Sequence, residues 1–301
     1  MATNTPFGQR LGLVLEGGAM RGIYTAGVLD VFLEAGIMPD VVVGVSAGAL
    51  HGCSYVAGQK GRSIRYYRKY RSDKHFMGLY SLLTTGDVVG TKFCYEDIPL
   101  RLDPFNEAAF EKAPVDFYVT VTNVRTGKPE YILCDELKVG SKMDVIRAGA
   151  SMPLCSKMVE WNGNLYLDGG VSDSIPYAKM KDFGCRKSIV VLTQPAGYLK
   201  QPAAMAPFEA MYRKYPAFVE AMRGRDQMYN TEVCAVEQAA KQGDVFLIRP
   251  SKLLHVGRME HDIEVLNAQY ELGRQDARNQ MDAMRAVSYT HLRAHETRSN
   301  L

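Results

Sequence analysis

Short apolar runs that alternate with glycine turns and amphipathic stretches dominate the first part of the chain. Leu11–Leu15 is apolar and ends at a glycine pair, and residues 23–35 then carry apolar side chains at helical spacing. Val41–Val45 follows, a β-branched run of the kind that is buried on both faces of a parallel sheet. Small residues after Ser46 lead into a second helix that reaches Ala57. This order predicts strand, helix, strand and helix, which is the beginning of an α/β fold.

The same kind of pattern continues along the chain. Residues 115–121 alternate like a strand and residues 131–133 return after a turn signal, so we expect a hairpin. We also expect a short helix at 143–150, further strands at 165–167, 188–193 and 245–248, and an amphipathic helix at 263–287. The sheet therefore has at least five strands.

The chain is expected to form one α/β domain over residues 8–287. A stretch rich in Pro, Ala and Gly at 194–207 is the best linker candidate, and mainly helical sequence follows it. Because the 245–248 run is expected to rejoin the same sheet, we interpret residues from about 203 to 242 as a helical insertion. Residues 288–301 lose the periodicity, so we interpret them as a non-native or disordered tail.

Composition and charge exclude several classes of protein. The chain has 301 residues, of which 47% are hydrophobic and 23% charged, which excludes a disordered, collagenous or coiled-coil protein. A net charge of +3 is too weak to indicate a nucleic-acid partner. The six cysteines form no C-x-x-C pair, and no cluster has metal-ligand spacing, so we expect no metal or cofactor. Neither a signal peptide nor a membrane span is expected, and reduced cysteines favour a cytoplasmic location.

Ser46 is the candidate nucleophile. Residues 44–48 read Gly-Val-Ser-Ala-Gly, a G-x-S-x-G motif in which the glycines allow a tight strand-to-helix turn that exposes the serine hydroxyl. The predicted strand and helix flank the motif on the correct sides. An ordinary glycine-lined serine in a βα turn remains the structural alternative.

A glycine-rich loop joins the first strand to the first helix. Its consecutive small residues would leave backbone N–H groups free to point at an anion. Since the carboxyl ends of neighbouring parallel strands meet at one edge of a sheet, this loop is expected near Ser46 as an oxyanion hole. Neither G-x-G-x-x-G nor a Walker A pattern is present, so nucleotide binding is the weaker interpretation. The candidate donors are Gly17, Gly18, Ala19, Met20, Arg21 and Gly22.

A third feature is Asp168, which follows a short strand and precedes Gly169 and Gly170. Taken alone, this sequence is ordinary turn chemistry. In order and approximate spacing, however, the glycine loop, the G-x-S-x-G motif and the Asp-Gly-Gly motif resemble the patatin-like phospholipase family, in its bacterial branch. The resemblance covers roughly residues 11–193.

The resemblance implies a three-layer α/β/α fold with a mainly parallel central sheet. It also implies a Ser-Asp dyad, with Ser46 as nucleophile and Asp168 as base, that hydrolyses lipid carboxyl esters through an acyl-enzyme without a cofactor. Two residues depart from the family pattern: Ala19 stands where the family usually has a third glycine, and Glu16 where it usually has Asp. The methyl group of Ala19 would strain the loop if its φ must be positive.

Two alternatives use the same residues differently. Ser46, Asp168 and either His255 or His261 occur in the order of an α/β-hydrolase triad, although only one strand precedes the strand that carries the serine. The second alternative, which depends on Ala19, is a catalytically idle protein that binds a lipid or acyl ligand for regulation.

The densest basic run of the chain spans residues 62–74 and is interleaved with tyrosines. Such runs are usually solvated faces of helices. Because an apolar stretch at 76–83 follows, a lipid-facing surface is the functional interpretation. We expect Arg65, Arg68 and Lys69 to make peripheral contact with anionic headgroups.

Overall fold

The computed structural model describes residues 9–283, and its centre is an eight-stranded sheet with the strand order β5-β6-β3-β2-β1-β7-β8. β4 pairs with β3 outside this path. The pairs β1–β2, β1–β7, β2–β3 and β7–β8 are parallel, whereas β3–β4, β3–β6 and β5–β6 are antiparallel. The strands are β1 (Arg10–Leu15), β2 (Val41–Val45), β3 (Asp116–Asn123), β4 (Pro129–Leu133), β5 (Val159–Trp161), β6 (Asn164–Asp168), β7 (Cys185–Val191) and β8 (Val245–Ile248).

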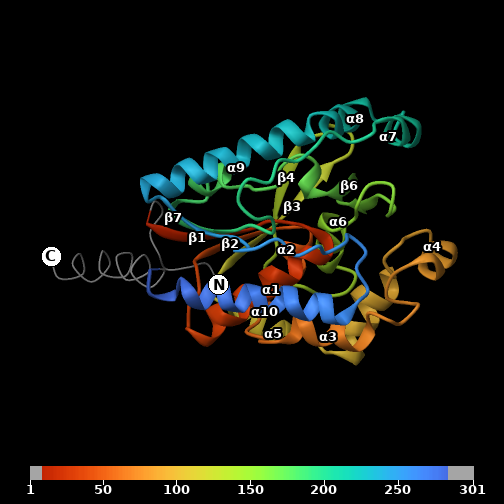
Figure 1. The fold of residues 1–301 in the computed structure, drawn as a ribbon. Coiled ribbons are helices and arrows are strands. Elements are labelled where there is room, and N and C mark those ends of the chain that lie inside the picture. Colours follow the sequence, from red (N-terminus) through yellow and green to blue (C-terminus); the bar gives the residue numbers. More distant parts are fainter. Residues whose placement is uncertain (1–8, 284–301) are drawn as a thin grey trace.

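Helices cover both faces of this sheet, which confirms the expected three-layer α/β/α fold with a mainly parallel sheet (Figure 1). One layer contains α1 (Ile23–Glu34), α2 (Ala47–Val56) and α10 (Ile263–Asn279), and the other contains the long helix α9 (Arg225–Gln242). The remaining helices are α3 (Arg62–Tyr70), α4 (Leu79–Thr85), α5 (Glu107–Lys112), α6 (Met143–Gly149), α7 (Ala206–Met211) and α8 (Pro216–Arg223). Short helical turns η1 (Ala19–Gly22), η3 (Gly169–Val171) and η4 (Ala178–Lys181), and a π-helical segment η2 (Phe93–Leu102), complete the set.

The hydrophobic core explains why the central strands read as continuous apolar runs. All five residues of β2 are buried, and its first three side chains alternate between two core clusters. Val42 packs toward α1 and α2, whereas Val41 and Val43 pack toward α9. Because helices cover both faces of the sheet, polar side chains are unfavourable on either face of this strand, and its sequence is continuously apolar.

Most predicted elements are present, although some bounds differ and some short elements, such as α5 and β5, had no sequence prediction. The expected hairpin is β3–β4, and the 245–248 run pairs in parallel with β7. The helix expected at 263–287 ends at Asn279, and its last four residues lie outside the described part, as does the tail at 288–301. The segment at 93–102 was not predicted, because Pro99 and its wider helical spacing break the usual 3.6-residue pattern. The single-domain interpretation stays a prediction.

The register of β3 brings two chain segments together that are far apart in sequence. Val45, the last residue of β2, lies opposite Thr120. Asp168, the last residue of β6, lies opposite the neighbouring residue Val121. Since β2 is parallel and β6 antiparallel to β3, the two strands approach from opposite directions. Their ends, and the loops that follow them, therefore meet beside the middle of β3.

Candidate active site

Ser46 lies at a strained turn between β2 and α2. Its φ of 53° and ψ of −122° fall outside the regions that side-chain-bearing residues favour, as expected for a nucleophile elbow. Gly48 makes the turn sterically feasible, because a Cβ there would lie 2.4 Å from the carbonyl oxygen of Leu15. The serine is itself buried, with 8% of its surface exposed.

Asp168 is the partner of this serine. Ser46 Oγ donates a hydrogen bond of 2.6 Å to Oδ2 of Asp168, and the N–H of Gly170 donates one of 2.8 Å to Oδ1. Burial raises the pKa of Asp168 from its ordinary value, and the hydrogen bond from Ser46 opposes that rise. The structure thus brings the two predicted residues into direct contact and fixes both carboxylate oxygens.

The glycine loop lies against the same serine. A Cβ on Gly17 would be 2.9 Å from the Cβ of Ser46, so glycine permits this close approach. In the described part of the chain, the N–H groups of Gly17, Gly18 and Ala19 donate to no protein acceptor, whereas the N–H of Arg21 is bonded to the carbonyl of Gly18. Gly17, Gly18 and Ala19 line a cavity that also contains Ser46. Their backbone donors are therefore available to an anion at the serine.

The two departures from the family pattern have structural consequences. Ala19 adopts a φ of +49°, so the positive angle that strains a residue with a Cβ is indeed required here. Glu16 is buried and accepts a 2.5 Å hydrogen bond from the N–H of Thr193, which links the residue after β1 to the second residue after β7. The hydroxyl of Thr193 donates to the carbonyl of Gly17 at 2.9 Å. Glu16 therefore helps to position the loop.

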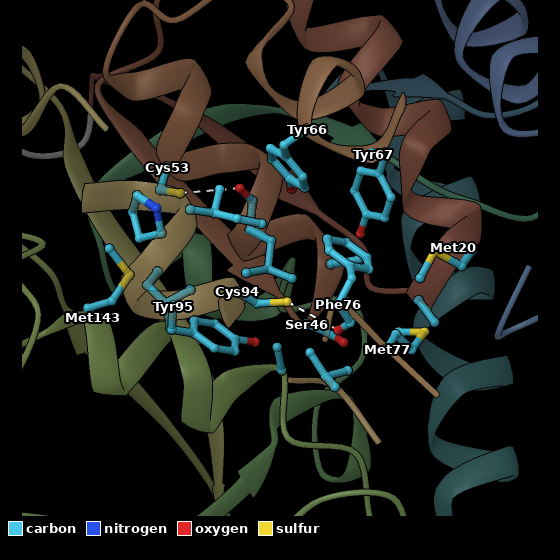
Figure 2. A pocket seen from close by; sticks show the side chains of 18 of the residues that line it. Met20, Ser46, Cys53, Tyr66, Tyr67, Phe76, Met77, Cys94, Tyr95 and Met143 are labelled. Atoms are coloured by element: carbon cyan, nitrogen blue, oxygen red, sulfur yellow. Dashed lines mark hydrogen bonds between the residues drawn. The ribbon is translucent and has the colours of Figure 1, made fainter. Parts of the chain in front are cut away.

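An apolar cavity of about 110 Å³ begins at Ser46 and extends between α2, α3, η2 and α6 (Figure 2). Its lining is almost entirely hydrophobic or aromatic, as an acyl chain would require. The segment η2, which sequence reasoning did not predict, contributes part of this lining. Among the lining side chains are Met20, Leu50, Tyr66, Tyr67, Phe76, Cys94, Tyr95, Ile98 and Met143.

Neither histidine of the alternative triad joins Ser46 and Asp168. His255 and His261 are exposed, whereas the serine and the aspartate are buried. Within residues 9–283, both oxygens of Asp168 are already occupied by Ser46 and Gly170, and no histidine side chain bonds to either residue. The geometry favours direct contact between serine and carboxylate.

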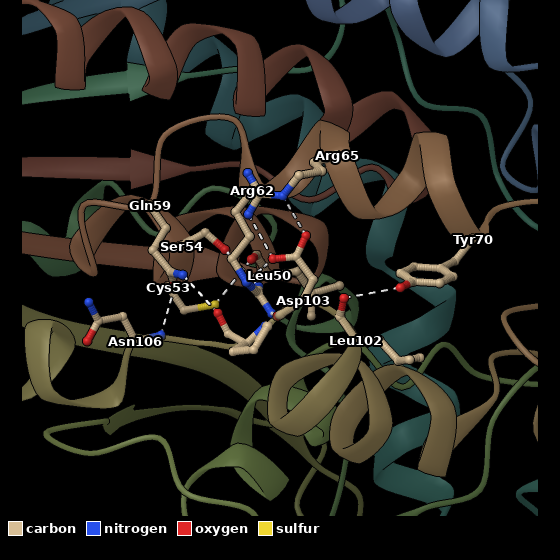
Figure 3. Close-up of polar contacts among 11 residues, drawn as sticks. Leu50, Cys53, Ser54, Gln59, Arg62, Arg65, Tyr70, Leu102, Asp103 and Asn106 are labelled. Carbon is tan, nitrogen blue, oxygen red and sulfur yellow. Dashed lines mark hydrogen bonds and ion pairs between the residues drawn. The ribbon is translucent and has the colours of Figure 1, made fainter.

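The basic run at 62–74 is less exposed than its composition predicts. Arg62 and Arg71 are buried, and Arg65 forms two hydrogen bonds of 2.7 Å to the carboxylate of Asp103 (Figure 3). Arg68 donates to Asn267 at 2.8 Å, and Lys69 lies beside the ring of Tyr70. Of the three residues predicted to contact headgroups, Arg65 thus has its charge paired, while Arg68 and Lys69 are exposed without an ion pair in the described part.

A model of the patatin-like phospholipase family matches residues 13–180, more than half of the chain. The chain belongs to this family. As a member it is a lipid acyl hydrolase, and the resemblance inferred from the three motifs is confirmed. A second model, the domain of unknown function DUF6363, matches residues 215–288, which include α8, α9, β8 and α10.

Curated relatives agree with this membership. The chain is 28% identical over 273 residues to the uncharacterized protein YjjU of Escherichia coli, covering 88% of this chain and 75% of that protein. It is 30% identical over 190 residues to lysophospholipase NTE1 of Saccharomyces cerevisiae, covering 61% of this chain but only 11% of that protein. A solved structure, VipD from Legionella pneumophila, aligns with a TM-score of 0.47 and 13% identity over 91% of this chain and 67% of that chain.

One short helix exposes apolar side chains. Among the helices of residues 9–283, none combines the length and apolar character that a bilayer-spanning helix needs. The short helix α4 nevertheless exposes Leu79 and Leu83 at 69% and 77%, and it projects from the body of the molecule (Figure 1).

Proposed function

We propose that the chain hydrolyses carboxyl esters of phospholipids or acylglycerols with a Ser46–Asp168 dyad. The observation that carries this proposal is the buried 2.6 Å hydrogen bond between the two side chains at the mouth of an apolar cavity. The yeast relative, which is named lysophospholipase NTE1, supports the same substrate class.

The reaction follows from these positions. Ser46 Oγ attacks the ester carbonyl while Asp168 accepts its proton, and the N–H groups of Gly17, Gly18 and Ala19 stabilise the oxyanion. The bond to the alcohol breaks, and Asp168 returns the proton to that alcohol. Water then attacks the acyl-enzyme with Asp168 again as base, which releases the fatty acid and regenerates the serine.

Labelling with a fluorophosphonate probe tests the nucleophile. The purified protein is expected to form one covalent adduct and to hydrolyse a short-chain ester, and Ser46→Ala should lose both. Ser251→Ala, at an exposed serine away from the site, is the control and should label normally. Co-purified lipid without labelling or ester turnover would support the idle lipid-binding alternative instead.

We further propose peripheral membrane contact through Arg68, Lys69 and the exposed leucines of α4, in a cytoplasmic protein. Lys74 Nζ lies 4.6 Å from the ring centre of Tyr80, so the basic run and α4 are adjacent. Exposed cations near an anionic bilayer contribute roughly 1 kcal/mol each. Arg65 belongs to the same face but also binds Asp103.

A vesicle-flotation assay of the Arg68→Glu, Lys69→Glu double variant tests this contact. The variant should bind anionic vesicles more weakly, with unchanged turnover of a soluble ester. Unchanged flotation would contradict the proposed contact.

A further inference from the structure

A second cavity, of about 170 Å³, opens beside Ser46. It shares only Ala19, Ser46 and Met152 with the apolar cavity. An ester whose acyl chain fills the apolar cavity therefore directs its alcohol portion toward this second space. The chemistry of the second cavity then selects the headgroup.

Four cationic side chains line the second cavity: Arg21, Lys200, Arg225 and Arg258. The carboxylates that also line it are Glu16 and Asp168, and these accept hydrogen bonds from Thr193, Ser46 and Gly170. In the part of the chain that the structure describes, none of the four cations lies within 4.0 Å of a carboxylate oxygen as an ion pair. Four cations thus face two carboxylates across the cavity, which leaves an excess of positive charge there.

Arg225 and Lys200 are fixed in place by neutral groups. Arg225 begins α9, and its Nε donates a 2.6 Å hydrogen bond to the carbonyl of Gly170. Asn230 holds the backbone of Lys200 by two hydrogen bonds, of 2.9 and 3.1 Å, and Lys200 Nζ lies 4.2 Å from the ring centre of Tyr229. Residues of α9 therefore hold Lys200 and Arg225 in position before any ligand binds.

The pKa values of Lys200 and Arg225 are consistent with a site that would bind an anion. Burial, and then the positive charge of Arg225, lower the pKa of Lys200 to about 8. Burial also lowers the pKa of Arg225. A bound anion would favour the charged form of both groups.

We propose that Lys200 and Arg225, with Arg21 and Arg258, bind the phosphate of a lipid headgroup, so that the enzyme prefers anionic headgroups to neutral or choline-bearing ones. This rests on the proposed lipid hydrolase function. A quaternary ammonium group would add a positive charge beside these cations, while both lining carboxylates are already engaged. A phosphate monoester or a phosphoglycerol group adds only negative charge.

Headgroup selectivity tests the proposal. Substrates with one identical acyl chain and either a phosphate monoester, phosphoglycerol, phosphocholine or free glycerol headgroup are compared by kcat/KM. A charge-assisted contact contributes enough for a roughly tenfold or greater preference for the anionic substrates. Lys200→Met should reduce that preference by about tenfold, and Lys200→Arg should retain it. Lys241→Met, an exposed lysine near the other end of α9, is the matched control and should retain it too.

A binding experiment separates this proposal from the hydrolase function. Calorimetry with Ser46→Ala protein is expected to detect glycerol 3-phosphate, with at least tenfold weaker binding after Lys200→Met. If no ester is hydrolysed but this binding is observed, the hydrolase proposal fails and the anion site stands. Equal binding of inorganic phosphate without headgroup selectivity would indicate a site for free phosphate and overturn the headgroup assignment. A wild-type enzyme that ignores headgroup charge and binds neither probe would overturn the proposal entirely.

Discussion

Ser46 Oγ donates a 2.6 Å hydrogen bond directly to Oδ2 of Asp168, with no histidine between them. The contact arises because β2 and β6 end beside adjacent residues of β3, Thr120 and Val121. Gly170 holds the second carboxylate oxygen at 2.8 Å. The carboxylate is therefore aimed at the serine before any substrate arrives.

Asp168→Asn should lower kcat/KM for a short-chain ester by about 10²- to 10⁴-fold, the usual contribution of a general base. The amide keeps the shape of the side chain but accepts the serine proton poorly. His255→Ala and His261→Ala, at exposed positions, serve as controls and should change the rate little. An equally large loss in either histidine variant would replace the dyad with the triad.

The pH profile of kcat/KM should report the ionisation of Asp168. Burial raises the pKa of this carboxyl, so its reactive charged form is lost at a higher pH than for an ordinary aspartate. Activity should therefore fall on the acidic side with a midpoint above 3.8. The positive charge of Arg225 lowers the same pKa. With a neutral short ester, Arg225→Gln should therefore shift the acidic midpoint to higher pH. An unchanged midpoint would show that a group other than Asp168 controls the acidic side of the profile.

Ala19→Gly should stabilise the protein or leave its stability unchanged, unlike most glycine substitutions. At a φ of +49° the alanine is strained by roughly 1–2 kcal/mol, and glycine removes that strain while costing about 0.4–1 kcal/mol through the unfolded chain. Urea denaturation measures the difference. Ala26→Gly, buried within α1, is the matched control and should lose about 1 kcal/mol. Equal destabilisation by both changes would contradict the strain assigned to Ala19.

Local sequence patterns predict the parts of the site that depend on turns. The strand, glycine and helix order around Ser46 indicates an elbow, because the glycines are required by close backbone approach, as at Gly48 against Leu15. The Asp-Gly-Gly sequence alone does not place Asp168, since its contact with Ser46 depends on the register of β3. The role of Asp168 as base is predicted from the resemblance to the patatin-like family, because hydrophobic periodicity does not reveal which strand ends meet.

Other features depend on contacts that no local pattern contains. The cations of the second cavity come from η1, the linker, the start of α9 and a late loop, so only the folded chain gathers them. The basic run predicts a solvated helix face, yet Arg62 is buried. Its guanidinium donates hydrogen bonds to the hydroxyl of Ser54 and the carbonyl of Asp103, and the carboxylate of Asp103 pairs with its charge. Charge composition alone cannot reveal such distant partners.

A buried carboxyl pair beyond the site should make stability depend on pH. Glu232 accepts hydrogen bonds of 3.2 and 3.0 Å from the N–H groups of Ser174 and Ile175. Burial, and then the negative charge of Asp173, raise the pKa of Glu232 to about 9. Between its ordinary value of 4.5 and this raised value, the folded state binds more protons than the unfolded state. Stability from this group is therefore fully present below pH 4.5 and is lost as the pH rises toward 9.

Glu232→Gln should flatten this dependence. The glutamine oxygen still accepts both backbone hydrogen bonds, but the side chain has no proton to lose and no charge to repel Asp173. Tm measured from pH 5 to 9 should decline less in the variant than in the wild type, so the variant gains most in relative stability at the alkaline end. Asp226→Asn, on the same helix, is the control and should follow the wild-type curve. A parallel decline of Tm in Glu232→Gln and the wild type would contradict this prediction. It would mean that Glu232 is already ionised in the folded protein at neutral pH, and that the backbone N–H groups balance the charge of the Glu232–Asp173 pair.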